Sequence, residues 1–337
     1  MNIYDISKKA GVSIATVSRV LNGNTNVSEK TRKKVEAVME ETGYTPNVFA
    51  RGLGLDSMKT IGILCADSSD SFLASAIYYI EQELRQFHYD VILCCTGYEL
   101  STKQKYLELL LSKRVDAVIL VGSNFVEQSK AKNKYIIEAA KRVPVIILNG
   151  HLDAANIYSS MCDDADAMYK VTKNFLNHGK RKILYLYRSL SYSGLKKLEG
   201  FKKAFEEQGI PLEEEQICLF NGTIEETRNM LMEVYKKGKR YEAILTSDDE
   251  LAIGAIKFAK ACHLAIPEEL SIVGYNNSKL GICCEPELTT VDNKLVFSCM
   301  NAVTTLMNVL NGSEVPAKTM ISADVKIRNT TNVSFDN

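Results

Sequence analysis

A short stretch near the start of the chain carries side chains that could contact DNA. Arg19 can direct two donors at O6 and N7 of a guanine, a contact worth about 1–3 kcal/mol of base discrimination. Ile14 and Ala15 can pack on thymine methyl groups. Hydroxyl and amide side chains beside them suit phosphate contacts, which position a protein without specifying sequence. The residues predicted to make such contacts are Ser13, Thr16, Ser18 and Asn22.

Helix start and stop signals indicate how these side chains are held. Asn2 can cap a first helix that ends near Gly11, where glycine tolerates the positive φ of a tight turn. Ser13 can cap a second helix over residues 14–21, and Ser28 can cap a third. Two helices joined by a short turn containing glycine form a helix-turn-helix, whose second helix enters the DNA major groove. The alternative is a small helical domain in which the arginine of the second helix forms only a surface salt bridge.

Charge is unevenly distributed along the chain. The formal net charge is zero over 337 residues, but residues 1–60 carry nine Lys and Arg against six Asp and Glu. Only this N-terminal part is electrostatically suited to a polyanion. The length predicts two or three compact units, each large enough to bury a core.

Cysteine and histidine usage argues against disulfides and metal sites. The nine cysteines are odd in number, form no CxxC pair and stand mostly in apolar runs, which is typical of buried thiols in a reducing compartment. The four histidines are scattered. The start lacks a signal-peptide pattern, and no apolar run approaches the roughly 20 residues needed to cross a bilayer. We therefore expect a cytoplasmic protein with no metal ion and no membrane association.

The remainder of the chain alternates short β-branched runs with longer stretches of helical periodicity, the pattern of parallel βαβ units. Predicted strands cover residues 60–65, 90–95, 116–121, 144–148, 182–187, 216–220, 243–246 and 271–275. Predicted helices cover residues 72–87, 101–113, 134–142, 165–178, 194–208, 225–236, 250–263 and 294–311. So many pairs favour two doubly wound parallel sheets over one. The predicted fold is a small all-α head on an α/β body of two lobes.

Domain boundaries are predicted from the same elements. The predicted units are a helix-turn-helix head (1–46), a linker (47–59), a first lobe (60–160 with 292–321) and a second lobe (161–291 with 322–337). Crossovers between the lobes are expected near residues 158–162, 288–292 and 321–324.

The head has a specific resemblance to a known family. The run from Ile6 to Gly23, ISKKAGVSIATVSRVLNG, resembles the head of the LacI/GalR (lactose/galactose repressor) family of bacterial transcription regulators. The likeness continues through Val27-Ser28, Gly43-Tyr44, Pro46-Asn47 and Ala50-Arg51 with Leu53, and extends along nearly the whole chain. The resemblance implies operator binding by the head and a body like that of periplasmic sugar-binding proteins.

The resemblance also implies a DNA-dependent hinge at residues 47–53. In the family this segment becomes a short helix on specific DNA and inserts a leucine into the minor groove, so Asn47, Ala50 and Leu53 are predicted DNA contacts. An apolar wedge of this kind partly unstacks a base step and kinks the duplex. Gly52 stands where the family more often has serine, and glycine costs about 1 kcal/mol relative to alanine in a helix. We expect Gly52→Ala to tighten operator binding and weaken the effector response in a binding titration.

An effector site between the lobes is implied by the same resemblance. The residues carried over by match are Asp67, Ser71, Phe72, Asn149, Ser193, Lys197, Ile224, Asp249 and Asn276. They stand near the carboxyl ends of predicted strands, where such sheets bind ligands, and their carboxylates, amides and aromatic ring suit a polyol. The alternative is that several are ordinary turn or capping residues.

Three of these positions depart from the family pattern. Lys197 stands where the family usually has arginine, and Asn149 and Asn276 stand where acids are common. The departures make the pocket less negative. They predict an effector that tolerates or carries negative charge, such as a sugar phosphate or sugar acid.

These patterns together predict an allosteric transcription regulator of carbohydrate-related genes. It would act as a repressor that binds a pseudo-palindromic operator as a homodimer and responds to a sugar-like effector. The body alone would also permit a solute-binding protein, and a nucleobase or a protein co-effector could replace the sugar. An enzyme is not predicted, because the sequence has no nucleophile elbow, phosphate loop or complete dinucleotide fingerprint. We therefore expect no cofactor.

Overall fold

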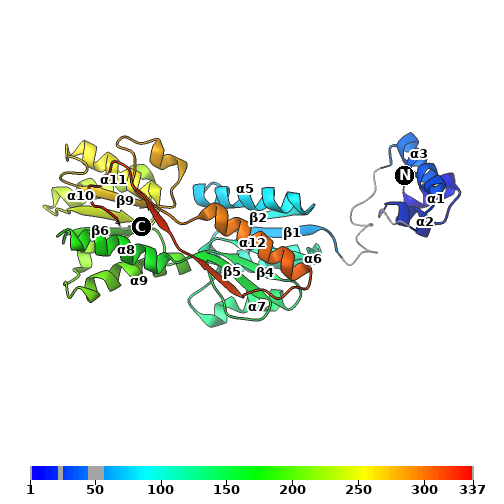
Figure 1. The fold of residues 1–337 in the computed structure, drawn as a ribbon, viewed down its shortest axis with the longest axis horizontal. Coiled ribbons are helices and arrows are strands. Elements are labelled where there is room, and N and C mark those ends of the chain that lie inside the picture. Colours follow the sequence, from blue (N-terminus) through cyan, green and yellow to red (C-terminus); the bar gives the residue numbers. More distant parts are fainter. Residues whose placement is uncertain (1, 22–25, 45–56, 336–337) are drawn as a thin grey trace. The chain divides into compact units, whose positions relative to one another are not determined.

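A computed structural model describes residues 2–21, 26–44 and 57–335 (Figure 1). It divides into two units, one made of residues 1–60 with 114–116 and the other of residues 61–113 with 117–337. Each unit is described by itself. Four residues predicted to contact DNA lie outside the described residues; they are Asn22, Asn47, Ala50 and Leu53.

The N-terminal unit contains three helices. They are α1 (Ile3–Ala10), α2 (Ile14–Leu21) and α3 (Glu29–Thr42). The predicted capping is confirmed: Asn2 and Asp5 form a reciprocal capping box at α1, and the Ser28 side chain accepts a hydrogen bond from a backbone N–H of α3. Gly11 ends α1 with a φ of 59°, a conformation that glycine adopts without strain. Apolar side chains of the three helices share a small core built on Ile6, Ala10, Val17, Val20 and Val35.

The larger unit contains two six-stranded sheets, here called the first and second lobes. The first sheet has the order β11 (Lys318–Ile321), β5 (Ile157–Cys162), β4 (Val145–Leu148), β3 (Ala117–Val121), β1 (Thr60–Cys65), β2 (Asp90–Cys95). The second has the order β12 (Asp324–Lys326), β10 (Thr290–Asp292), β9 (Ser271–Tyr275), β8 (Ala243–Thr246), β6 (Ile183–Tyr187), β7 (Ile217–Leu219). The neighbouring strands whose residue pairing is given by the structure run parallel, except β10 and β12, which run antiparallel.

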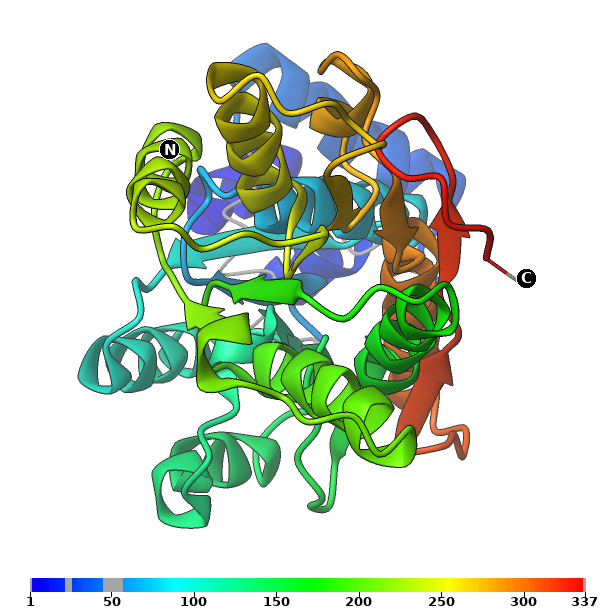
Figure 2. The ribbon, with the colours of Figure 1, turned by 90° about the vertical axis from the view of Figure 1, so that its left-hand side faces the viewer.

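Helices cover both faces of each sheet (Figures 1 and 2). Those of the first lobe are α5 (Ser71–Gln86), α6 (Leu100–Ser112), α7 (Lys134–Ala140) and α12 (Leu295–Leu310). Those of the second are α8 (Asp164–Asn177), α9 (Tyr192–Glu207), α10 (Ile224–Lys236) and α11 (Asp249–Ala261). Short 3-10 turns are η1 (Ser123–Phe125), η2 (Lys130–Asn133), η3 (Glu214–Gln216) and η4 (Lys279–Ile282). Helices α5 and α12 share one apolar core with β1, β3 and β4, whereas α8 with α9 and α10 with α11 pack on opposite faces of the second sheet.

The chain passes between the lobes three times, after β5, after β10 and after β11. The eight predicted strands are confirmed within one or two residues, and so are the eight helices after residue 60. The prediction missed β5, β10, β11 and β12, which stand at the expected crossovers. These strands are short or carry polar residues, so their periodicity is weak. The exact domain boundaries given above stay a prediction.

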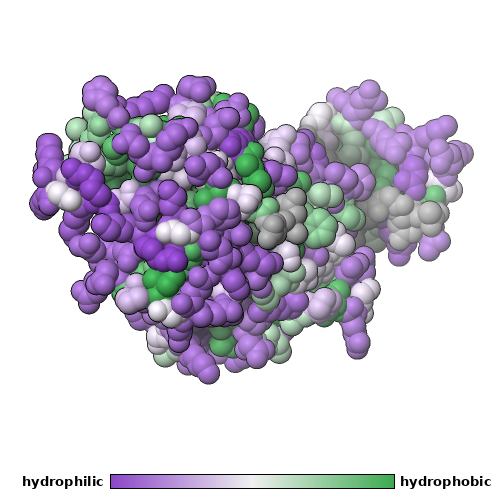
Figure 3. Space-filling model, turned by 60° about the vertical axis from the view of Figure 1, so that its left-hand side comes forward, coloured by the Kyte–Doolittle hydropathy of each residue, from purple (hydrophilic) through white to green (hydrophobic). Residues whose placement is uncertain are grey.

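The surface facing the viewer in Figure 3 is largely hydrophilic, with separate hydrophobic patches. No helix in the described part of the chain has the length and apolar character that spanning a membrane requires.

Candidate functional site

Helix α2 presents the predicted base-contacting side chains to solvent. Val17 is buried in the core of the head, and this fixes the rotation of the helix. Ile14 is 39% exposed, and Ala15 and Arg19 are also exposed. Within the described residues, the Arg19 guanidinium has no hydrogen bond or ion pair, so its donors are available to a ligand. The predicted residues are thus brought together on one exposed helix.

Ser13 and Thr16 form the start of this helix. The Ser13 hydroxyl accepts a hydrogen bond from the Thr16 backbone N–H at 3.1 Å, which confirms the predicted cap. The two hydroxyl groups also lie 2.9 Å apart. Ser18 is half-buried. Their predicted phosphate contacts remain predictions.

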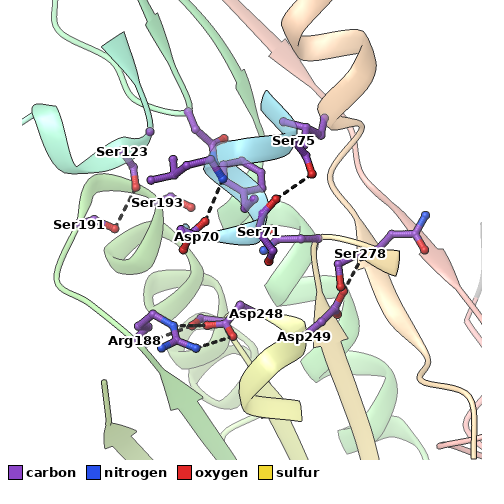
Figure 4. Close-up of a pocket in the computed structure, with 18 of the residues that line it drawn as sticks. Asp70, Ser71, Ser75, Ser123, Arg188, Ser191, Ser193, Asp248, Asp249 and Ser278 are labelled. Atoms are coloured by element: carbon purple, nitrogen blue, oxygen red, sulfur yellow. Dashed lines mark hydrogen bonds and ion pairs between the residues drawn. The ribbon is translucent and has the colours of Figure 1, made fainter. Parts of the chain in front are cut away.

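A cavity of about 710 Å³ lies between the two lobes of the larger unit (Figure 4). Its wall is built mainly from residues that follow the carboxyl ends of parallel strands, together with the first turns of α5 and α12. Seven of the nine predicted effector residues lie on this wall. They are Ser71, Phe72, Asn149, Ser193, Lys197, Asp249 and Asn276.

The other two predicted residues, Asp67 and Ile224, are not on the cavity wall. Asp67 lies in the loop after β1, and its carboxylate accepts hydrogen bonds from the Ser69 N–H at 2.8 Å and the Ser69 hydroxyl at 2.7 Å. Ile224 begins α10 after the Thr223 cap. Asp67 is therefore a turn residue here, the alternative that the sequence left open.

Asp249 lies on the wall, but its carboxylate is already bonded within the second lobe. It is 2% exposed, and it accepts hydrogen bonds from the Ser278 N–H at 2.6 Å and the Thr290 hydroxyl at 2.5 Å. Burial raises the pKa of Asp249, and these two hydrogen bonds partly oppose that rise. A Cβ at residue 274 would lie 2.3 Å from this carboxylate, so Gly274 leaves the space that it occupies. Asp249 therefore connects α11 to β10 and to the loop that follows β9.

An ionic cluster that the sequence analysis missed forms the adjacent wall (Figure 4). The Arg188 guanidinium, 26% exposed, donates two hydrogen bonds of 3.0 Å to Asp248 and one of 3.3 Å to Glu250. It also donates to the Gly222 carbonyl at 3.0 Å and, at 3.4 Å, to Asn221. These contacts engage all five N–H groups of Arg188, so it balances one of the two carboxylate charges and has no free donor for a ligand.

Contacts across the cavity connect the lobes. The Ser71 hydroxyl of α5 donates to Glu250 of α11 at 3.5 Å, and the Ser123 hydroxyl donates to that of Ser191 at 3.0 Å. Burial raises the pKa of Glu250, and the positive charge of Arg188 opposes this effect. A ligand in the cavity would therefore touch groups that already hold the two lobes together.

Aromatic and apolar side chains form another part of the wall. Phe72 and Tyr98 come from the first lobe, and Val296, Phe297 and Met300 come from the first turns of α12. Tyr98 and the three α12 side chains are exposed, so they could pack on the apolar face of a ring. The wall combines such faces with amides and hydroxyl groups, which suits a small polar ring.

The missed wall residues share one signal. Arg188 directly follows β6, and Asp248 is the N-cap of α11 two residues after β8. Tyr98 comes soon after β2. A search for polar and aromatic residues just after each predicted parallel strand would have found them.

Family models match two parts of the chain. Residues 2–47 match bacterial regulatory proteins of the lacI family, and residues 58–329 match periplasmic binding proteins and the sugar binding domain of the LacI family. The chain belongs to the LacI family. This confirms the resemblance seen in the head and the fold predicted for the body.

Similar proteins extend this assignment. An HTH-type transcriptional regulator of Lachnoclostridium phytofermentans is 57% identical over 98% of this chain and 100% of its own length. Catabolite control protein A of Priestia megaterium is 31% identical over 86% of this chain and 87% of its own. This LacI-family chain is thus a DNA-binding transcriptional regulator, and its relatives are regulators rather than enzymes.

Solved structures agree with the fold. The lac repressor dimer bound to operator and the anti-inducer ONPF is 25% identical, with a TM-score of 0.87 over 98% of this chain and 99% of that one. The transcriptional regulator CelR in complex with cellobiose, at 20% identity and a TM-score of 0.70, shares the fold over 98% of this chain and 99% of that one.

Proposed function

We propose that this LacI-family regulator represses carbohydrate-related genes by binding a pseudo-palindromic operator as a dimer, under the control of a sugar-like effector. The observation that carries the proposal is the cavity of about 710 Å³ lined by both lobes. Its size suits a small ligand, since ligand pockets span about 300–1,000 Å³. Its aromatic rings, amides and hydroxyl groups suit a polyol.

The head supports the operator part of the proposal. Arg19, Ile14 and Ala15 are exposed on the second helix of the helix-turn-helix, which enters the major groove in such motifs. One head reads one half-site, so a dimer reads two related half-sites. The solved lac repressor that shares this fold is a dimer bound to operator.

The cavity supports the control part of the proposal. The contacts of Ser71 with Glu250 and of Ser123 with Ser191 join the lobes across the cavity. An effector that exchanges these contacts for its own would shift the balance between lobe arrangements. Such a shift changes operator affinity if the two arrangements present the hinge segments differently.

Fluorescence anisotropy of the full chain on DNA from upstream of its own gene tests this function. We expect saturable binding that a scrambled duplex does not show, and a changed affinity with one class of sugar. Phe72→Ala, which removes an aromatic ring from the wall, should blunt the sugar response. Leu219→Ala removes an exposed side chain outside the cavity and should leave it intact. Sugar binding without any specific DNA binding would instead support a solute-binding protein.

A further inference from the structure

Lys197 brings a buried ammonium group to the cavity wall. It is 6% exposed, its Nζ donates to the Ser247 carbonyl at 3.0 Å, and this nitrogen lies 3.7 Å from the centroid of the Tyr275 ring. An ammonium group has three N–H donors, so this environment leaves capacity for a further acceptor. Across residues 2–21, 26–44 and 57–335, no carboxylate lies within ion-pair distance of the Lys197 Nζ.

A second buried lysine, Lys103, has its charge paired with a carboxylate. Lys103 is 3% exposed, and its Nζ lies 3.0 Å from the Glu127 carboxylate and 2.5 Å from the Asn124 carbonyl. Buried charges are normally paired, because an uncompensated ion loses its hydration without replacement. Lys103 follows this rule, whereas Lys197 has no carboxylate partner among the residues that the structure describes.

Several carboxylates of the cavity wall are already paired with other cations. Asp248 and Glu250 bind Arg188, and Asp292 lies 3.4 Å from the Lys294 Nζ. The Asp292 carboxylate also accepts the Lys294 backbone N–H at 3.0 Å. Within the described residues, none of these three carboxylates lies within ion-pair distance of the Lys197 Nζ.

The remaining nearby carboxylates are held by neutral donors. Asp70 caps α5, and Asp249 is bonded to Ser278 and Thr290 as described above. Asp164 accepts the Ser193 hydroxyl at 2.5 Å and the Tyr275 hydroxyl at 2.6 Å. Among the described residues, Asp164 is thus connected to Lys197 only through the Tyr275 side chain, and no carboxylate bonds to the lysine directly.

We propose that the effector carries an anionic group, a carboxylate or a phosphate, and that Lys197 binds this group. The proposal rests on the function proposed above and specifies its ligand as an anionic sugar derivative. A neutral hydroxyl could accept a hydrogen bond from Lys197, but only an anion would give this buried charge a direct ionic partner. The uncharged amides of Asn149 and Asn276 on the same wall add donors for the sugar without adding negative charge.

Calorimetry with matched sugars tests the proposal. The full chain is titrated with glucose, glucuronate and glucose 6-phosphate, and with galactose, galacturonate and galactose 6-phosphate. We expect one acid or phosphate to bind about tenfold or more tightly than its neutral parent. Comparison of the carboxylate and phosphate members identifies which anion Lys197 accepts.

Three variants link that preference to Lys197. Lys197→Met should remove the advantage of the anion, and Lys197→Arg should keep most of it. Lys257→Met makes the same charge change at an exposed position outside the cavity and should leave it unaltered. Equal or tighter binding of the neutral sugars overturns the anion proposal alone. If no sugar of either kind binds, both this proposal and the carbohydrate effector are contradicted.

Chemical denaturation without ligand gives an independent readout. Lys197→Met removes a buried charge that has no direct ionic partner in the described residues and should leave the chain at least as stable as the wild type. Lys103→Met removes one partner of a buried ion pair and should lower the denaturation midpoint. Equal destabilisation by the two substitutions would show that Lys197 is already compensated without ligand, and this would overturn the proposal.

Discussion

Two arginines show how differently the head and the cavity wall use the same side chain. Arg19 on α2 is exposed and has no polar partner within the described residues. Arg188 on the cavity wall binds Asp248, Glu250, Asn221 and a backbone carbonyl. Arg19 is therefore available to an external ligand, whereas Arg188 is held by partners within its own lobe. The lesson is that residue type alone does not identify a binding residue; its existing partners must be counted.

The largest expected effect comes from a substitution in the core of the head, which should separate DNA binding by the head from ligand binding by the larger unit. Ile6 is fully buried in the small core of the head, and Ile6→Ala should cost about 2–5 kcal/mol of stability. We expect loss of specific DNA binding, measured by anisotropy, with ligand binding in the larger unit retained in calorimetry. Loss of both activities would contradict the independence of the two regions.

Removing Arg188 should affect stability. Arg188→Met leaves two partly buried carboxylates without their cation and should lower the free energy of unfolding by about 1.5–3 kcal/mol. Arg228→Met is the control, because Arg228 pairs with Glu225 at the surface and such pairs contribute about 0–1 kcal/mol. Urea denaturation compares the two, and an equal loss would show that the wall cluster is no stronger than a surface pair.

Removing Arg19 should affect DNA selectivity and not stability. Arg19→Ala should cost about 1–3 kcal/mol of discrimination between the preferred operator and one altered at the contacted guanine. Lys33→Ala, at an exposed position on α3, should at most weaken binding equally for both duplexes. Competition binding measures the ratio of the affinities for the two duplexes. If this ratio is unchanged in Arg19→Ala, Arg19 does not contact the guanine.

The smallest expected effect is a pH dependence from Asp249. Its folded-state pKa is raised above the ordinary 3.8, so it favours folding most at low pH and that contribution is lost as pH rises through the raised value. Asp249→Asn should therefore gain stability relative to wild type with rising pH, measured by urea denaturation between about pH 3 and pH 7.

Asp324 provides a control of opposite sign. A hydrogen bond from Lys294 lowers the pKa of Asp324 below the ordinary 3.8, so its stabilisation is present above that value and is lost as pH falls through the lowered one. Asp324→Asn should lose stability relative to wild type as pH rises. If the stability difference from wild type changed with pH in the same direction for both variants, the environments assigned to Asp249 and Asp324 would be contradicted.

Local signals made the head predictable from the sequence. The caps at Asn2, Ser13 and Ser28 act within a few residues, as does the turn at Gly11. Most strands and helices of the lobes were also predictable, because buried parallel strands are continuous apolar runs. The short strands β10 and β12 gain their pairing from distant segments, so sequence periodicity could not show them.

The sequence could not show which hydrogen-bond and ion-pair partners the side chains of the cavity wall have. Asp249 was predicted to bind a ligand, but its carboxylate is engaged by Ser278 and Thr290, the latter 41 residues away. Arg188 and Asp248 are 60 residues apart, and their ion pair depends on the order of β6 and β8 in the sheet. Such contacts follow from topology rather than from local sequence.

Selection of duplexes from a random DNA library by the full chain tests the central claim most directly. We predict enrichment of a pseudo-palindrome with two related half-sites, because each exposed α2 reads one half-site. The Arg19→Ala variant should lose the preference at one base pair in each half-site. Recovery of sequences no more related than the starting library, from a chain that still binds its ligand, would contradict the account.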